Sequence, residues 1–231
     1  MSSRTNRPKK KPAVQRELVR AKGRTASQEE YIEDMLNNDY VICIGPAGTG
    51  KTHLAAGIGA ENLIDKTVRK LILTRPCIAT EKIGFLPGDQ EAKIHPYLIP
   101  LFDELNYFID VDHYIRTKQV FIEPIAFLRG RTIKDSFIIV DEAQNCTFSQ
   151  LKMIATRLGS GSQMIINGDP DQSDLPPYGE GSSGLADFVR CIENDSSCQE
   201  GVIKIRTFTK SDIVRHPSVS VILNALEKKG H

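Results

Sequence analysis

The chain has 231 residues, which fits one large domain or two small ones with a substantial buried core. Its 40% hydrophobic and 26% charged residues are typical of a globular protein and exclude wholesale disorder. No apolar run approaches the roughly 18 residues that cross a bilayer, and no apolar stretch follows the basic N-terminus. We therefore expect neither a membrane span nor a signal peptide, and no membrane partner.

The cysteines and histidines do not predict a zinc site. Five cysteines lie at positions 43, 77, 146, 191 and 198, without a C-x-x-C pair or a histidine at zinc-like spacing, and the five histidines are scattered. We expect a cytoplasmic protein with reduced thiols.

Charge is distributed unevenly along the chain. Residues 1–24 carry nine Lys or Arg side chains and one acid, whereas the remaining residues carry 21 basic and 28 acidic side chains. We predict a basic, disordered arm over 1–24 and a single domain over 25–231. Such an arm fits a polyanion such as nucleic acid, and a solvated leader without a partner explains it equally well.

From residue 25 onward, helix-like and strand-like patterns alternate. A first helix is expected to begin near Ser27, with Ser27 as its N-cap and Glu30 three residues later. Apolar runs typical of buried parallel strands are YVICI (40–44), KLILT (70–74), QVFIE (119–123), FIIV (137–140), QMIIN (163–167) and VIKIRTF (202–208). Helical patterns cover 53–64, 96–109, 149–158, 185–193 and 219–228. The alternation predicts an α/β domain with a mostly parallel sheet flanked by helices.

The strongest motif is a phosphate-binding loop directly after the first expected strand. The sequence GPAGTGKT satisfies G-x-x-x-x-G-K-S/T between a strand and a helix, the context that this motif requires. Backbone N–H groups of such a loop converge on phosphate oxygens, and the following helix N-terminus adds positive charge. The predicted nucleotide-binding residues are Gly45, Pro46, Ala47, Gly48, Thr49, Gly50, Lys51, Thr52 and His53. Lys51 is expected to reach the β- and γ-phosphates, and the Thr52 hydroxyl to ligate Mg²⁺.

A second motif, VDE, ends another apolar strand. Asp141 and Glu142 would stand at the carboxyl edge of the sheet, where α/β folds bind ligands. We expect Asp141 to hold Mg²⁺ and Glu142 to act as the general base for the attacking water.

Two glutamines are further candidates. Gln172 closes GDPDQ after a third apolar strand and could contact a γ-phosphate or its water, although a type I turn at Pro170 is an alternative for this segment. Gln28 could present its amide to an adenine edge, and an exposed helical glutamine is the alternative there.

Taken in order, several motifs resemble the PhoH family of P-loop ATPases. They are GPAGTGKT, LTRP (73–76), GFLPGD (84–89), RGRT (129–132), VDEAQN (140–145), GDPDQ (168–172) and DIVRHP (212–217). The resemblance covers roughly 25–228 and implies a RecA-like fold similar to the first motor domain of superfamily 1 helicases, with ATP binding and hydrolysis and a link to RNA metabolism. Some relatives fuse this domain to a PIN ribonuclease, but no further acidic cluster here resembles a nuclease site.

The resemblance adds candidates to the site. It places Thr74 and Arg75 at a strand end where related motors touch single-stranded nucleic acid, and makes Arg129 and Arg131 candidate phosphate anchors. A strand terminus and a salt-bridged turn are the alternatives. Arg215 is the candidate arginine finger, supplied to a neighbouring subunit.

The chain holds one phosphate loop, whereas a complete helicase motor closes two RecA-like domains over ATP. We therefore expect a homo-oligomer, in the form of a ring such as a hexamer. The leading hypothesis is a Mg²⁺-dependent ATPase that remodels or unwinds single-stranded RNA or, less in keeping with the resemblance, DNA. The alternative is a nucleotide-dependent assembly switch without strand translocation. A small-molecule kinase is disfavoured, because Asp-Glu followed by GDPDQ suits water as the nucleophile.

Overall fold

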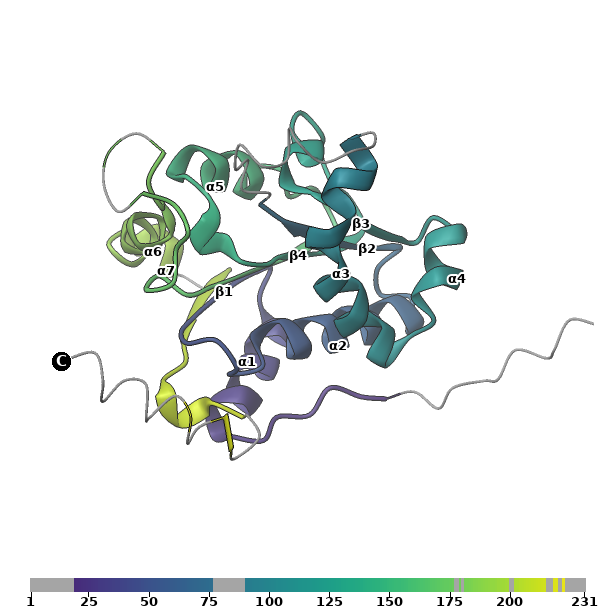
Figure 1. The fold of residues 1–231 in the computed structure, drawn as a ribbon, viewed down its shortest axis with the longest axis horizontal. Helices are drawn as coiled ribbons and strands as arrows, with labels where there is room; N and C mark the ends of the chain where they lie inside the picture. The colour runs from purple at the N-terminus through teal and green to yellow at the C-terminus, as the bar shows by residue number, and fades with distance from the viewer. Residues whose placement is uncertain are drawn as a thin grey trace, which may run out of the picture.

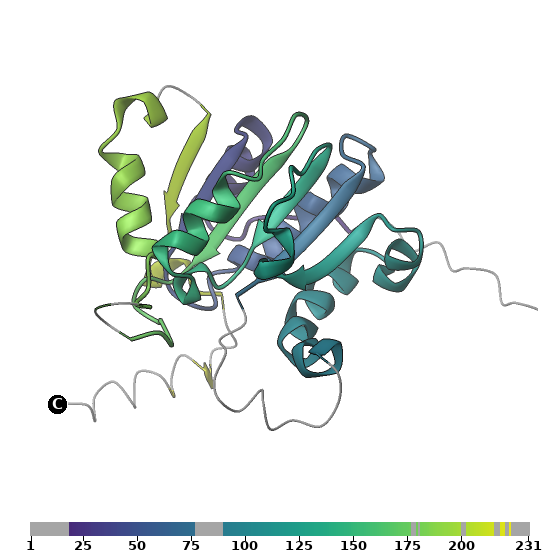
Figure 2. The same ribbon diagram turned by 90° about the horizontal axis from the view of Figure 1, so that it is seen from above.

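A computed structural model describes residues 19–76, 90–176, 179, 181–199, 202–214, 218, 219 and 222, without the side chains of 90–96 and 199. Its centre is a six-stranded sheet in the order β3-β2-β4-β5-β1-β6, in which every pairing is parallel. The strands are β1 (Tyr40–Ile44), β2 (Lys70–Arg75), β3 (Val120–Pro124), β4 (Ser136–Val140), β5 (Gln163–Gly168) and β6 (Ile203–Thr207). Figure 2 shows them side by side with the twist usual for such sheets.

Helices cover both faces of the sheet (Figure 1). The described helices are α1 (Ala26–Asn37), α2 (Lys51–Ile64), α3 (Gln90–Phe108), α4 (Val111–Arg116), α5 (Phe148–Ala155), α6 (Leu185–Glu193) and α7 (Ser196–Gln199). Short 3₁₀ helices lie at Ile125–Leu128, Ala143–Asn145 and Lys210–Asp212. The expected α/β class with a mostly parallel sheet is confirmed.

Alternating side chains of the strands divide the core into two halves. In β4, Phe137 and Ile139 belong to the half under α1, α2 and α3, whereas Ile138 and Val140 belong to the half under α5 and α6. This is the two-residue period of a strand buried on both faces, which explains why the strand sequences read as continuous apolar runs. A Cβ built on Gly59 of α2 would lie 3.0 Å from Phe137 Cδ1, so this helix packs close to the sheet.

All six expected strands are present, with ends shifted by at most one residue. The helical ends differ more: α2 begins at Lys51 rather than at 53, and α3 begins at Gln90 rather than at 96. The N-cap of α1 is Thr25 and not Ser27, because the Thr25 hydroxyl accepts the Gln28 N–H. The helical pattern expected over 219–228 lies almost wholly outside the described residues.

Contacts of the folded body reach back beyond the boundary expected at residue 24. The Ala21 N–H donates to Glu61 Oε1 of α2 at 2.7 Å, and Arg20 lies 3.6 Å from the other oxygen of this carboxylate. Residues 1–18, which hold most of the predicted basic arm, lie outside the described residues, so the prediction of a disordered arm stays a prediction.

The strand order brings the two phosphate-site motifs to either side of β5. This strand pairs with β1 on one side and with β4 on the other, so the loops after all three strands emerge next to one another at the carboxyl edge. Among the described helices, none is long and apolar enough to cross a membrane.

Replacing a buried ring of β4 should measure the core directly. Phe137→Ala should lower the free energy of unfolding by about 3–5 kcal/mol, because it removes a fully buried aromatic side chain and leaves a cavity. Urea unfolding followed by circular dichroism measures this loss. The matched control is Phe127→Ala, a ring that is 49% exposed, which should change the free energy by no more than about 0.5 kcal/mol. Equal losses in the two variants would contradict the assigned core.

Candidate phosphate site

The loop from Gly45 to Gly50 joins β1 to α2 and depends on glycine at particular positions. Gly45 has φ +139°, and a Cβ there would lie 2.4 Å from the Phe208 carbonyl oxygen. Gly50 has φ +83° and is the residue before the first turn of α2. These values are unfavourable for other residues, so the sequence requirement of the motif follows from backbone geometry.

Lys51 extends back over the loop. Its ammonium donates to the carbonyl oxygens of Gly45 at 2.6 Å and Pro46 at 2.9 Å. Burial lowers the pKa of Lys51 from its ordinary value, while negative groups including Asp169 and Asp141 act in the opposite direction. The charge therefore lies against the carbonyl oxygens of the loop, in the segment where the motif predicts phosphates.

Thr52 and Asp141 meet although 89 positions separate them. The Thr52 hydroxyl donates to Asp141 Oδ1 at 2.6 Å, and Asp141 is 4% exposed. Burial raises the pKa of Asp141 from its ordinary value, and Arg75 and the Thr52 hydrogen bond oppose this rise. A hydroxyl beside a carboxylate is an oxygen donor pair suited to Mg²⁺, which keeps waters and phosphate oxygens as its other ligands. The pair thus fits this ion, and none of the described residues form a cluster of three or more His, Cys, Asp or Glu for a metal held by protein side chains alone.

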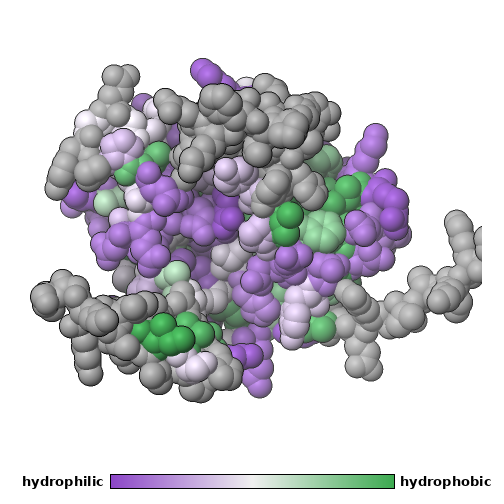
Figure 3. Space-filling model, in the orientation of Figure 1, coloured by the Kyte–Doolittle hydropathy of each residue, from purple (hydrophilic) through white to green (hydrophobic). Residues whose placement is uncertain are grey.

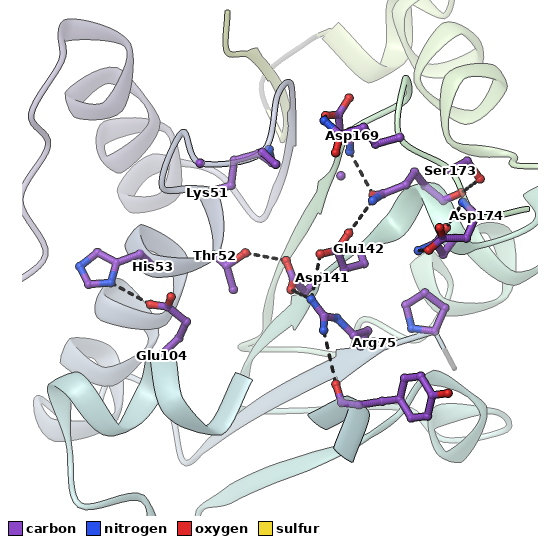
Figure 4. A pocket seen from close by; sticks show the side chains of 18 of the residues that line it. Lys51, Thr52, His53, Arg75, Glu104, Asp141, Glu142, Asp169, Ser173 and Asp174 are labelled. Atoms are coloured by element: carbon purple, nitrogen blue, oxygen red, sulfur yellow. Dashed lines mark hydrogen bonds and ion pairs between the residues drawn. The ribbon is translucent and has the colours of Figure 1, made fainter. Parts of the chain in front are cut away.

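Glu142 follows Asp141 in a left-handed conformation, with φ +54°. Its Oε1 accepts from Arg75 Nη2 at 2.8 Å, and its Oε2 accepts from Gln144 Nε2 at 2.5 Å. Arg75 Nη2 also donates to Asp141 Oδ2 at 3.1 Å (Figure 4). One guanidinium therefore joins both acids of the VDE motif.

The turn after β5 completes this side of the site. Gln172 donates to Asp169 Oδ2 at 2.7 Å, and the Asp169 N–H donates to Gln144 Oε1 at 3.0 Å. The hydrogen bonds therefore run from Gln172 through Asp169 and Gln144 to Glu142. Gln172 lines the cavity on this side, and its contact with a phosphate or water stays a prediction.

These residues line a cavity of about 740 Å³. It is bounded by the phosphate loop, the ends of β2, β4 and β5, and Tyr97 and Glu104 of α3. The lining includes the charged side chains of Asp141, Glu142, Asp169, Lys51 and Arg75. On the face drawn in Figure 3, the described residues near the middle are mostly hydrophilic, and hydrophobic groups are confined to smaller areas.

A second cavity of about 670 Å³ borders the same loop. The two cavities share Gly48, Gly50, His53 and Glu104 as lining residues. His53 Nδ1 lies 2.9 Å from Glu104 Oε2, and its ring packs against Tyr107 and Phe108, so α3 fixes the side chain that follows Thr52.

Gln28 also borders this second cavity, but it is 3% exposed and does not project freely. Its Nε2 donates to the Thr49 carbonyl at 2.8 Å, and its Oε1 accepts the Arg24 N–H at 2.7 Å. The alternative of an exposed helical glutamine is therefore wrong. The observed role is to tie α1 to the phosphate loop, and an adenine contact stays a prediction.

The residues expected to contact nucleic acid fall into two groups. Thr74 is fully buried, and the Arg75 guanidinium is directed towards the acids of the cavity rather than to an open surface. Arg129 and Arg131 are exposed after the edge strand β3, and Arg131 pairs with Glu123 at 2.7 Å. A strand contact at either place stays a prediction. Arg215 and the GFLPGD segment lie outside the described residues.

Comparison with known proteins settles the family. The family model described as "PhoH-like protein" matches residues 20–227, nearly the whole chain. The chain therefore belongs to the PhoH-like protein family. It is 43% identical over 217 residues to a PhoH-like protein of Synechocystis sp. and 44% identical over 210 residues to one of Bacillus subtilis. These alignments cover 92% and 89% of this chain, but 63% and 64% of the two relatives, so the chain spans slightly less than two thirds of their length.

A solved structure supports the fold of this PhoH-like chain. The large terminase of a thermophilic bacteriophage superposes with a TM-score of 0.51 over 87% of this chain and 49% of the terminase, at 12% identity. At that identity the likeness concerns the fold alone.

Sequence reasoning missed several residues of this PhoH-like site, among them Gln144 and Glu104. Gln144 lies within VDEAQN yet showed no chemical signal of its own, because its role depends on bonds to Glu142 and to the Asp169 backbone. Glu104 lies in the expected helix over 96–109, but only the packing of α3 on α2 brings it to His53. The sequence does not single Glu104 out, because Asp103 and Asn106 beside it are polar as well.

The bond between α1 and the loop can be tested by truncating Gln28. Gln28→Ala should lower the free energy of unfolding by about 1–3 kcal/mol, because the Thr49 carbonyl and the Arg24 N–H lose buried partners. Asn37→Ala at the exposed end of the same helix is the control and should have a small effect. A Gln28→Ala protein as stable as the control variant would refute this role.

Proposed function

We propose that this protein is a Mg²⁺-dependent ATPase that couples hydrolysis to remodelling or unwinding of single-stranded nucleic acid, RNA rather than DNA. The observation that carries the ATPase part is the 2.6 Å hydrogen bond between Thr52 Oγ1 and Asp141 Oδ1. It joins the phosphate loop to the acid motif of β4, and these are the two halves from which P-loop nucleotide sites are built.

Each phosphate-site residue then has a defined task. Backbone N–H groups of the loop and the N-terminus of α2 bind the phosphate oxygens, and Lys51 places its charge at the β- and γ-phosphates. Thr52 and Asp141 would hold Mg²⁺, which when bound neutralises charge on the phosphates. Glu142 takes the proton of the attacking water. Gln172 orients this water or the terminal phosphate. Hydrogen bonds through Asp169 and Gln144 connect Gln172 to Glu142, so a movement of Gln172 would also move the general base.

The two cavities suggest which part of a bound nucleotide each of them would hold. The larger one, with Lys51 and the acids, suits the phosphates, and the second suits the base and ribose, since Gly48, Gly50 and His53 border both. Tyr107 lines the second cavity, so an aromatic ring would stand beside the base there. Gln28, whose amide is bonded to Thr49 and Arg24, borders the same cavity.

Coupling to nucleic acid is supported by the carboxyl edge of β3. Phe127, Arg129 and Arg131 follow this edge strand and are exposed, which places an aromatic ring beside two cations. A ring that stacks bases and cations that pair with phosphates are the usual elements of single-strand binding. Arg75 and Pro124 are paired in register, so this surface lies at the same sheet edge as the phosphate site.

We further propose a homo-oligomeric ring such as a hexamer, in which Arg215 of one subunit completes the site of its neighbour. The support is the motif DIVRHP, whose arginine is the candidate finger for a neighbouring site, together with the rule that head-to-tail contacts between copies close into rings.

Turnover should depend on the loop lysine and on the acid of β4. Lys51→Ala should lose nucleotide binding or turnover, because its charge supports the phosphates. Glu142→Gln should bind ATP but lower the rate of phosphate release by at least about 10²-fold, since no general base remains. Fluorescent nucleotide binding and steady-state phosphate release measure the two effects. Wild-type turnover by either variant would refute the site assignment.

Single-stranded RNA should stimulate the wild-type rate more than DNA, and the stimulation should fade as salt rises, since phosphate contacts release counterions. A wild-type rate that is indifferent to both strands would instead favour a nucleotide-dependent assembly switch. Glu142→Gln serves as the blank in this salt series.

A further inference from the structure

Both carboxylate oxygens of Glu142 are held by protein groups. Oε1 accepts a charge-assisted hydrogen bond from Arg75 at 2.8 Å, and Oε2 accepts from Gln144 at 2.5 Å. The backbone of Glu142 has φ +54°, a conformation that a non-glycine residue adopts at a cost and that sets the direction of this side chain. A general base has to accept a proton from water through one of these oxygens.

The two partners of Glu142 differ in how firmly they are fixed. Gln144 is 4% exposed, accepts the Asp169 N–H at 3.0 Å, and receives the Ser173 hydroxyl on its backbone carbonyl oxygen at 2.9 Å. Its position is therefore set by the turn after β5. Of the two partners of Glu142, Gln144 is therefore the one with a fixed position.

Apart from its bonds to Asp141 and Glu142, the Arg75 guanidinium is held more weakly than the Gln144 side chain. Its Nη1 makes a long 3.4 Å bond to the Tyr97 carbonyl, and its buried Nε has no partner among the described residues. The guanidinium borders the cavity that contains Lys51 and the phosphate loop. Five N–H donors in a planar fork suit phosphate as well as carboxylate, so a phosphate oxyanion that enters this space would compete with Glu142 for Arg75.

We propose that Arg75 is a latch on the general base, which a phosphate oxyanion opens by drawing the guanidinium away from Glu142. Arg75 is a positioning residue in this arrangement, because it acts through Glu142. The inference rests on the proposed ATPase function. The oxyanion is either the terminal phosphate of the nucleotide or a phosphate of a bound strand, and the two sources predict different measurements.

A double-mutant cycle measures the coupling between Arg75 and Glu142 without requiring ATP hydrolysis. Thermal midpoints are measured for the wild type, Arg75→Gln, Glu142→Gln and the double variant. The change in midpoint of the double variant should differ from the sum of the two single changes by roughly 2 °C, as expected for a partly buried ion pair in a chain of this size. The cycle is repeated with Mg²⁺ and the non-hydrolysable analogue AMP-PNP, and again with oligouridylate added.

Loss of the coupling with AMP-PNP alone would assign the latch to the nucleotide phosphate. Loss only after oligouridylate is added would assign it to the strand. Additive midpoints in the free protein, or a coupling that survives both ligands, would overturn the proposal. Since no step of this test needs hydrolysis, an inactive wild-type protein would refute the proposed function without affecting the result.

Kinetics separate a latch from a structural role. If the nucleotide opens it, Arg75→Gln should raise the KM for ATP by at least about tenfold, because a phosphate contact is lost. If the strand opens it, Arg75→Gln should raise the strand-independent kcat several-fold at an unchanged KM and abolish stimulation. Wild-type kcat, KM and stimulation in this variant would overturn the proposal.

The matched control is Arg69→Gln. It removes a guanidinium that lies 3.9 Å from Asp135 at the opposite end of β2, where both side chains are exposed. This control should leave the midpoint, kcat and KM close to those of the wild type.

Discussion

The parallel pairing of β5 between β1 and β4 is the constraint on which the site depends. Ile42 of β1 is paired with Ile166 of β5, which in turn is paired with Val140 of β4, so the three strands end within two residues of one another. The phosphate loop, the acid pair and the Asp169 turn then emerge together. A shift of one residue in either pairing would also exchange the two core faces, so the packing that stabilises the sheet fixes the register of the site.

This edge places unlike charges close together. Lys51 and Arg75 stand among Asp141, Glu142 and Asp169, and most of these side chains have at least one hydrogen-bonded partner within the site. Burial makes each bond stronger and each unpaired charge more costly. A phosphate group with its metal ion would therefore be accommodated when charged side chains of the site exchange their present partners for it. Apart from its bonds to the acids, Arg75 makes one hydrogen bond, to the Tyr97 carbonyl, whereas Lys51 is bonded to the Gly45 and Pro46 carbonyls.

The sequence was sufficient for the parts of the site that are contiguous in the chain. The phosphate loop and the VDE motif follow strands whose apolar runs are unmistakable, and the resemblance placed both in the right family. Positions that depend on tertiary contacts were harder. Arg75 meets Asp141 and Glu142 only because β2 pairs with β4, and Gln28 reaches Thr49 only because α1 packs on the loop. Neither contact leaves a periodic pattern in the sequence.

The most direct test of this account is the affinity for ATP, measured by titration calorimetry with Mg²⁺ and with excess EDTA, for the wild type and Asp141→Asn. If Thr52 and Asp141 form the metal-binding pair of an ATP site, Mg²⁺ should raise the affinity of the wild type by at least about tenfold and that of the variant very little. The same dependence on Mg²⁺ in both proteins, or no binding of ATP to the wild type, would contradict it.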